Sequence, residues 1–222
     1  MIPTLHVITD DEILTREGFV FKAMGVLEAG GEGVVFHLRG PRTSGKVLHS
    51  LARVLKGPAE AHGCRLLAND RVDLALALDL SGAHLGQRSL PPGVARRILG
   101  PHRLLGLSVH GLTEAGEGLT GIVDFLLAGT IYPSFSHPEG IPEGVPGGGA
   151  GGVPGGVARI REIRGISTVP LVAIGGMTPD RVAEVLAAGA HGVAVRGGIW
   201  DAGDPTAATR VYLEELEKGS GT

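Results

Sequence analysis

The stretch LVAIGGMTPDRVAEVLAAGAHGVAVRGG, residues 171–198, contains one complete repeating unit of the fold. The apolar runs Leu171–Ile174 and Gly192–Val195 predict two buried strands, and Pro179–Ala188 between them predicts a helix. Thr178-Pro179 places a capping side chain before a proline at the first helical position. Strand, helix and strand in this order predict a parallel βαβ unit with a right-handed crossover.

The same alternation continues over the rest of the chain. It predicts further strands at Leu5–Thr9, Val34–Leu38, Arg65–Ala68, Gly82–Leu85, Leu104–Val109 and Val123–Ala128. It predicts further helices at Phe19–Ala29, Lys46–Ala61, Val72–Leu78, Gly93–Leu99, Thr113–Gly118, Val157–Ile163 and Thr206–Lys218. Because strands and helices alternate from end to end, we expect an α/β protein that is a single (β/α)8 TIM barrel over residues 1–222. A doubly wound open sheet is the alternative.

Composition excludes several classes of protein. The chain is 43% hydrophobic and 19% charged, which is typical of a soluble globular domain. A formal net charge of −3 gives no basic surface for nucleic acid or an anionic membrane, so neither is expected as a partner. Cys64 is the single cysteine, which excludes an intramolecular disulfide. With no signal-like start and no long apolar span, we expect a cytoplasmic location.

One segment departs from this alternation. Residues 139–156 read EGIPEGVPGGGAGGVPGG, a Gly/Pro-rich loop between the sixth predicted strand and the next helix. It is either a solvated insertion or a lid, since long loops on this face of a barrel often close over a site.

In a barrel of this kind the functional residues follow the C-terminal ends of the strands, which we call the strand exits. Gly175-Gly176 and Gly197-Gly198 stand at the last two exits, where unhindered backbone N–H groups can hold a phosphate. Arg196 is a candidate counter-charge. The alternative is that the glycines only form tight turns.

Polar residues at other exits are candidates for binding a substrate, namely Arg39, Asn69, Asp70, Ser108 and Thr130. The planar guanidinium of Arg39 could clamp an anion, or it could form a structural ion pair with Asp70. We expect no metal site, because Gln87, Arg88 and Ser89 occupy the fourth exit where a second carboxylate would be needed.

Histidines at strand exits are candidate acids and bases, because the imidazole pKa suits proton transfer near neutral pH. Four of the nine histidines lie at or just after exits, namely His37, His84, His110 and His137.

Five motifs, in order, resemble the thiamine phosphate synthase/TenI family over residues 5 to about 215. They are Leu5-His6-Val7-Ile8-Thr9-Asp10, Asn69-Asp70-Arg71-Val72-Asp73-Leu74-Ala75-Leu76, Gly82-Ala83-His84-Leu85-Gly86-Gln87, Ser108-Val109-His110 and Ile174-Gly175-Gly176-Met177-Thr178-Pro179. The family fold is a (β/α)8 barrel. The resemblance implies thiamine biosynthesis, a small phosphorylated thiazole ligand and a homodimer.

The family contains two main activities. Thiamine phosphate synthases join a pyrimidine diphosphate to thiazole phosphate with Mg²⁺, and their motifs are Gln-x-Arg-Glu-Lys, Gly-Gln-Glu-Asp and Thr-x-Thr-Lys. Here the corresponding positions read His37-Leu38-Arg39-Gly40-Pro41, Gly86-Gln87-Arg88-Ser89 and Ser134-Phe135-Ser136-His137. Both lysines and the second Mg²⁺ carboxylate are absent, which removes charge neutralisation that a departing diphosphate requires.

The chain therefore looks closer to TenI, a thiazole tautomerase that aromatises thiazole phosphate carboxylate by proton transfer and needs no cofactor. TenI has a catalytic histidine in Gly-His-Val-Phe, where this chain has Gly129-Thr130-Ile131-Tyr132. We expect another histidine to serve as the acid or base, in the order His137, His37, His110. A synthase with an altered diphosphate site, which would use Mg²⁺, and a non-catalytic thiazole-phosphate-binding or regulatory protein are the alternatives.

Overall fold

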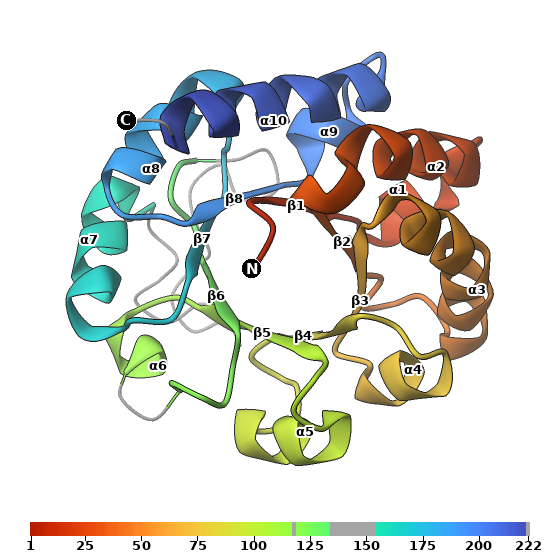
Figure 1. Cartoon of the computed structure of the whole chain (residues 1–222), viewed down its shortest axis with the longest axis horizontal. Helices are drawn as coiled ribbons and strands as arrows, with labels where there is room; N and C mark the ends of the chain where they lie inside the picture. Colours follow the sequence, from red (N-terminus) through yellow and green to blue (C-terminus); the bar gives the residue numbers. More distant parts are fainter. Residues whose placement is uncertain (117–118, 134–153, 221–222) are drawn as a thin grey trace.

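The structure is a computed structural model that describes residues 1–116, 119–133 and 154–220. Eight parallel strands form a closed barrel in chain order, and the helices surround it (Figure 1). The strands are β1 (Leu5–Ile8), β2 (Val34–Leu38), β3 (Arg65–Asn69), β4 (Gly82–Leu85), β5 (Leu104–Val109), β6 (Phe125–Ala128), β7 (Leu171–Ile174) and β8 (Gly192–Val195). The predicted TIM barrel is confirmed, and the open-sheet alternative is wrong because β1 pairs with β8.

The helices follow the predicted pattern with two additions. The α-helices are α1 (Asp11–Thr15), α2 (Phe19–Gly30), α3 (Gly45–His62), α4 (Val72–Ala77), α5 (Pro92–Leu99), α6 (Leu112–Ala115), α7 (Gly156–Ile166), α8 (Val182–Ala187), α9 (Gly197–Trp200) and α10 (Pro205–Ser220). Short 3₁₀ turns, η1 (Gly31–Gly33) and η2 (Pro179–Arg181), precede β2 and α8. The sequence did not predict α1 or α9, which are too short to show a helical period.

Local signals explain where the main helices begin and end. The carboxylate of Asp204 accepts hydrogen bonds from the amides of Thr206 and Ala207 at the start of α10. Gly63 ends α3 in the left-handed conformation, at φ 76°, which glycine adopts without steric cost. No helix in the described ranges is long and apolar enough to cross a bilayer.

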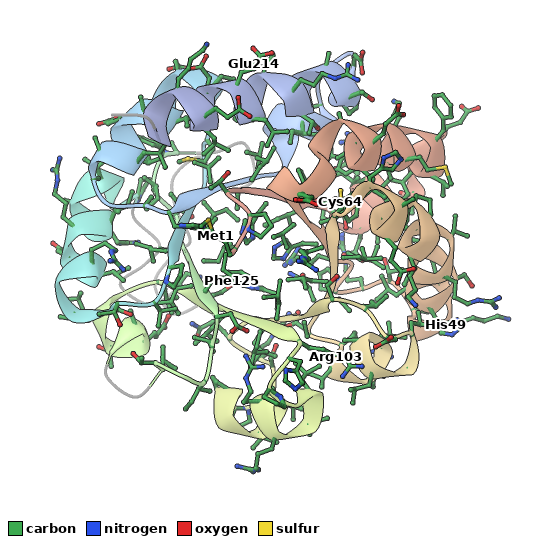
Figure 2. The ribbon with its side chains drawn as sticks, viewed as in Figure 1. Met1, His49, Cys64, Arg103, Phe125 and Glu214 are labelled. Carbon is green, nitrogen blue, oxygen red and sulfur yellow. The ribbon has the colours of Figure 1, made fainter. Side chains whose placement is uncertain are left out.

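The barrel strands are apolar on both faces, as expected for parallel strands covered by helices. Outward-facing residues join the helices in one large core, while inward-facing residues, including Val35, Leu67 and Phe125, form a second cluster inside the barrel. Figure 2 shows Phe125 inside the barrel and Glu214 on the outer side of α10. The C-terminal ends of all eight strands lie at one end of the barrel, which we call the mouth.

Candidate active site

Arg39 follows β2 at the mouth, and its backbone is fixed by Thr9. The Thr9 hydroxyl accepts from the Arg39 amide at 2.9 Å and donates to the Arg39 carbonyl at 2.9 Å. The half-buried Arg39 side chain forms no ion pair and no hydrogen bond with any described residue. The alternative, an ion pair with Asp70, is not formed. Arg39 therefore offers an uncompensated guanidinium to an anion at the mouth.

Asp70 follows β3, and its carboxylate forms a small network with the loop after β4. Its Oδ1 atom accepts a hydrogen bond from the Gly86 amide at 2.8 Å and another from the Ser89 hydroxyl. The Gly86 amide also donates to the Ser89 hydroxyl at 2.9 Å. Asp70 is exposed, and its Oδ2 atom has no hydrogen-bond partner among the described residues. This free oxygen is the part of the network that could bind a cation.

The site at Asp70 offers few protein ligands for a magnesium ion. No group of three or more His, Cys, Asp or Glu residues in the described ranges is arranged to hold a metal. Mg²⁺ is often held by one or two carboxylates together with substrate phosphates and water. The donor set at Asp70 fits that mode, with a single carboxylate.

The two glycine pairs lie at adjacent exits, after β7 and β8, which are paired strands. The amides of Gly176, Gly197 and Gly198 donate to no other described residue. These amides are therefore available to a phosphate, and the phosphate site itself stays a prediction.

The glycines are also required by the packing. Gly175 and Gly176 have φ values of 101° and 60°, which side-chain-bearing residues rarely adopt. A Cβ atom at Gly176 would overlap the carbonyl oxygen of Pro133, and one at Gly198 would overlap the Tyr212 hydroxyl. The turn interpretation and the phosphate interpretation are thus compatible for these residues.

Arg196 stands beside the glycine pairs, but its charge is already partnered. Its guanidinium donates to the carboxylate of Asp10, which also caps α1 by accepting from the Ile13 amide at 2.9 Å. Burial raises the pKa of Asp10, but the Ile13 amide and Arg196 outweigh this effect and leave the pKa below its usual value. Arg196 would therefore share its charge between Asp10 and a bound phosphate.

His37 lies inside the barrel rather than at its mouth. It is 0% exposed, and its ring lies among those of His6, His84 and Phe125. Burial, together with the neighbouring His84, holds the pKa of His37 well below its ordinary value. A fully buried, weakly basic imidazole cannot exchange protons with a substrate above the mouth, so the structure argues against His37 as the acid or base.

Of the other two candidate catalytic histidines, the structure describes His110 but not His137. His110 is half-buried after β5, with its Nδ1 atom 3.1 Å from the Gln87 amide nitrogen and 3.3 Å from a carboxylate oxygen of Glu114. His137 lies outside the described residues, as does most of the 139–156 loop. The described end of that loop lies beside Thr130 and Ile131, whose carbonyls accept from the amides of Gly155 and Gly156 at 3.0 and 2.9 Å.

Asn69 and Ser108 complete the predicted polar set, and both contact interior histidines. Asn69 Oδ1 lies 3.1 Å from His37 Nδ1, and Ser108 Oγ lies 2.8 Å from His84 Nε2. The sequence placed His84 at an exit, whereas the structure buries it beneath Ser108. The strand period of two could have shown this. Residues two apart in a strand share a face, so His84 lies on the same face as Gly82 in β4, and Ser108 on the same face as Gly106 in β5.

Comparisons with known proteins identify the family. Residues 5–199 match the family model described as thiamine monophosphate synthase. The chain is 34% identical over 216 residues to the thiamine-phosphate synthase of Shouchella clausii, covering 97% of both chains. It is also 40% identical over 174 residues to the bifunctional protein ThiM/ThiE of Symbiobacterium thermophilum, of which it covers 34%.

A solved structure agrees with these relatives. The thiamine phosphate pyrophosphorylase from Pyrococcus furiosus superposes with a TM-score of 0.79 at 29% identity, covering 97% of this chain and 96% of that one. These names favour the synthase alternative over the tautomerase that the motif differences suggested, and they do not support a closer relationship to TenI. The chain is an enzyme of thiamine biosynthesis and belongs to the thiamine monophosphate synthase family.

Proposed function

We propose that the chain is a thiamine-phosphate synthase, which joins a pyrimidine diphosphate to thiazole phosphate and releases diphosphate. The observation that carries the proposal is the unpaired guanidinium of Arg39, a residue that lies at the same end of the barrel as Asp70 and the glycine pairs with their free amides. A transferase of this kind needs two anion sites, one for each phosphorylated substrate.

Each group has a distinct role in this proposal. The amides of Gly176 and Gly197 hold the thiazole phosphate, because backbone N–H groups there can approach an anion closely. Arg39 binds the diphosphate through its planar fork of donors and stabilises the charge that develops as the diphosphate departs. Asp70 would hold Mg²⁺ together with diphosphate oxygens, and the bound ion would supply further charge neutralisation.

The site differs from the family's synthase motifs in ways that affect the rate. Pro41 and Ser89 stand where those motifs have a lysine and an aspartate. Arg39 therefore neutralises a larger share of the diphosphate charge than it would beside a lysine. We expect Arg39→Ala to lower kcat/KM by roughly 10²- to 10³-fold, which is typical of losing one charge-stabilising donor.

The matched control is Arg53→Ala, which removes an exposed arginine from α3. Arg39→Ala should leave the unfolding midpoint close to that of the parent, because its side chain has no partner among the described residues. Equal activity in the two variants would contradict the proposed role of Arg39.

The experiment that tests the function supplies purified protein with Mg²⁺, the pyrimidine diphosphate and thiazole phosphate. Formation of thiamine phosphate with equimolar release of diphosphate is expected. The absence of both products, with substrates bound, would contradict the proposal.

The second candidate function is the thiazole tautomerase. It is favoured by the replacement of a lysine by Pro41 and of a carboxylate by Ser89, since proton transfer requires neither group. In this case His137, and after it His110, would serve as the acid or base. Proton NMR of thiazole phosphate carboxylate incubated with the protein distinguishes this candidate, because aromatisation changes the ring signals without any diphosphate present.

A further inference from the structure

A buried histidine lies directly beneath a polar residue of the mouth. His84 is 2% exposed, and its Nε2 atom lies 2.8 Å from the Ser108 hydroxyl oxygen. The ring stacks on Phe125, which Figure 2 shows inside the barrel, with centroids 5.6 Å apart and planes at 20°. His37 contacts the ring edge to face at 5.2 Å. His84 is therefore held in one orientation by packing on two sides.

The opposite nitrogen of the ring has no partner. His84 Nδ1 is buried and forms no hydrogen bond with the described residues. It faces Gly106 on the neighbouring strand, where a Cβ atom would overlap both the imidazole and Phe125. Gly106 thus makes the space for this ring but supplies no acceptor on this side.

These contacts determine which nitrogen carries the proton. Burial lowers the pKa of His84 to about 3, with further contributions from His6 and Arg39, so the ring is neutral at pH 7. A proton on Nδ1 would be a buried donor without an acceptor, an arrangement that is unfavourable and rare in proteins. A proton on Nε2 is satisfied by Ser108, and only an acceptor lone pair then remains unmatched.

We propose that His84 is a positioning residue: its Nε2–H group donates to the Ser108 oxygen and so directs the Ser108 O–H toward an acceptor atom of the ligand. A hydroxyl has one donor and two acceptor lone pairs. With one lone pair occupied from below, Ser108 presents its proton to a phosphoryl oxygen at the mouth. The identity of this ligand rests on the proposed function.

The same two atoms could suggest a Ser–His pair in which the histidine removes the serine proton. A neutral imidazole whose pKa is near 3 takes up almost no second proton at neutral pH, so this arrangement would not activate the hydroxyl. The structure therefore favours positioning over proton transfer.

The first experiment determines the tautomer without any ligand. Nitrogen-15 NMR of histidine-labelled protein separates protonated from unprotonated ring nitrogens, and His84→Asn assigns the signals. We expect a protonated Nε2 and a bare Nδ1 that stay unchanged from pH 8 to pH 5. A protonated Nδ1 would overturn the proposal.

The second experiment is a double-mutant cycle with inorganic diphosphate as the probe, measured by calorimetry. We expect Ser108→Ala to weaken binding roughly tenfold, the worth of a hydrogen bond to a charged acceptor. His84→Leu should weaken it by a similar factor, and the double variant should bind no more weakly than Ser108→Ala alone. If the double variant instead lost affinity by the product of the two single factors, the proposal would be overturned, because His84 would then act independently of Ser108.

Two further measurements separate positioning by His84 from a loss of stability and from a site that binds no phosphate. His84→Gln, which can place an amide N–H near the Nε2 position, should restore part of the affinity that His84→Leu loses, whereas a purely structural effect would follow the unfolding midpoints. A parent protein with no affinity for diphosphate or phosphate would overturn the role of Ser108 toward the ligand. Failure to form thiamine phosphate would count against the proposed function alone, because neither the tautomer nor the cycle depends on turnover.

Discussion

The Ser89 hydroxyl donates a hydrogen bond to the carboxylate of Asp70, joining the loop after β4 to the end of β3. In the synthase motif that the sequence resembles, an aspartate stands at the position of Ser89. The structure places the two positions in direct contact, so an aspartate at position 89 would bring a second carboxylate to Asp70. Without a cation between them, two such carboxylates would repel each other.

We predict that Ser89→Asp strengthens Mg²⁺ binding by roughly tenfold, because a second nearby carboxylate adds at least about 1.4 kcal/mol of attraction. The variant should be less stable than the parent without Mg²⁺ and should regain stability when the ion is added. Thermal unfolding with and without Mg²⁺ measures both effects. The neutral control is Ser89→Asn, and an equal response to Mg²⁺ in the two variants would contradict the prediction.

Much of the barrel was predictable from local sequence. The βαβ unit around Gly175-Gly176 can be identified from apolar runs, Pro179 and glycine turns, and the structure has β7 and β8 at the predicted residues. The predicted cap at Thr178 is wrong, because its hydroxyl forms no capping hydrogen bond and the segment begins as the 3₁₀ turn η2. These signals act over a few residues, so they can be recognised before any tertiary contact is known.

The direction of each side chain was harder to predict. His37 and Leu38 are both buried, although they point to opposite faces of β2. In a strand covered on both faces, hydrophobicity does not alternate, so the pattern does not separate barrel interior from outer core. For this reason the sequence placed His37 at the mouth. The contact between Ser89 and Asp70 could not be predicted either, because it joins two exits whose proximity is known only from the fold.

The buried histidines predict a dependence of stability on pH. Burial lowers the pKa values of His6, His37 and His84, whereas the unfolded chain binds protons near pH 6.5. Below that pH the unfolded state binds more protons than the folded state, so stability falls as the pH drops below about 6.5 toward 4. Each histidine contributes a slope of up to about 1.4 kcal/mol per pH unit.

Urea unfolding between pH 7.5 and 4.5 tests this dependence. His37→Gln should lower the slope by about 1.4 kcal/mol per pH unit, since one buried imidazole is removed. His102→Gln, which removes an exposed imidazole, is the control. A slope in His37→Gln equal to that of the parent would show that His37 is protonated in the folded protein.

Gly176 should contribute to the stability of the fold as well as to binding. It has a φ of 60°, and a Cβ there would overlap the Pro133 carbonyl oxygen. Gly18 has a similar φ of 70° but open space around it. Gly18→Ala should therefore cost about 1 kcal/mol for backbone strain alone, and Gly176→Ala at least about 1–3 kcal/mol more. Urea unfolding of both variants measures the difference, and equal losses would show that the loop beside Gly176 moves away at little cost.

The ion pair between Arg196 and Asp10 should limit the affinity of the glycine pairs for phosphate. Asp10→Asn keeps an oxygen that can cap α1 through the Ile13 amide, but it removes the charge that partners Arg196. The freed guanidinium is then available to the phosphate, so we expect inorganic phosphate to bind roughly three- to tenfold more tightly, with the gain reduced at high salt. Arg196→Gln should weaken binding by a similar factor.

The lowered pKa of Asp10 keeps its carboxylate ionised at pH 7, so calorimetry at that pH compares charged and neutral partners directly. Weaker binding in both variants would mean that Asp10 orients Arg196 for the phosphate instead of competing with it.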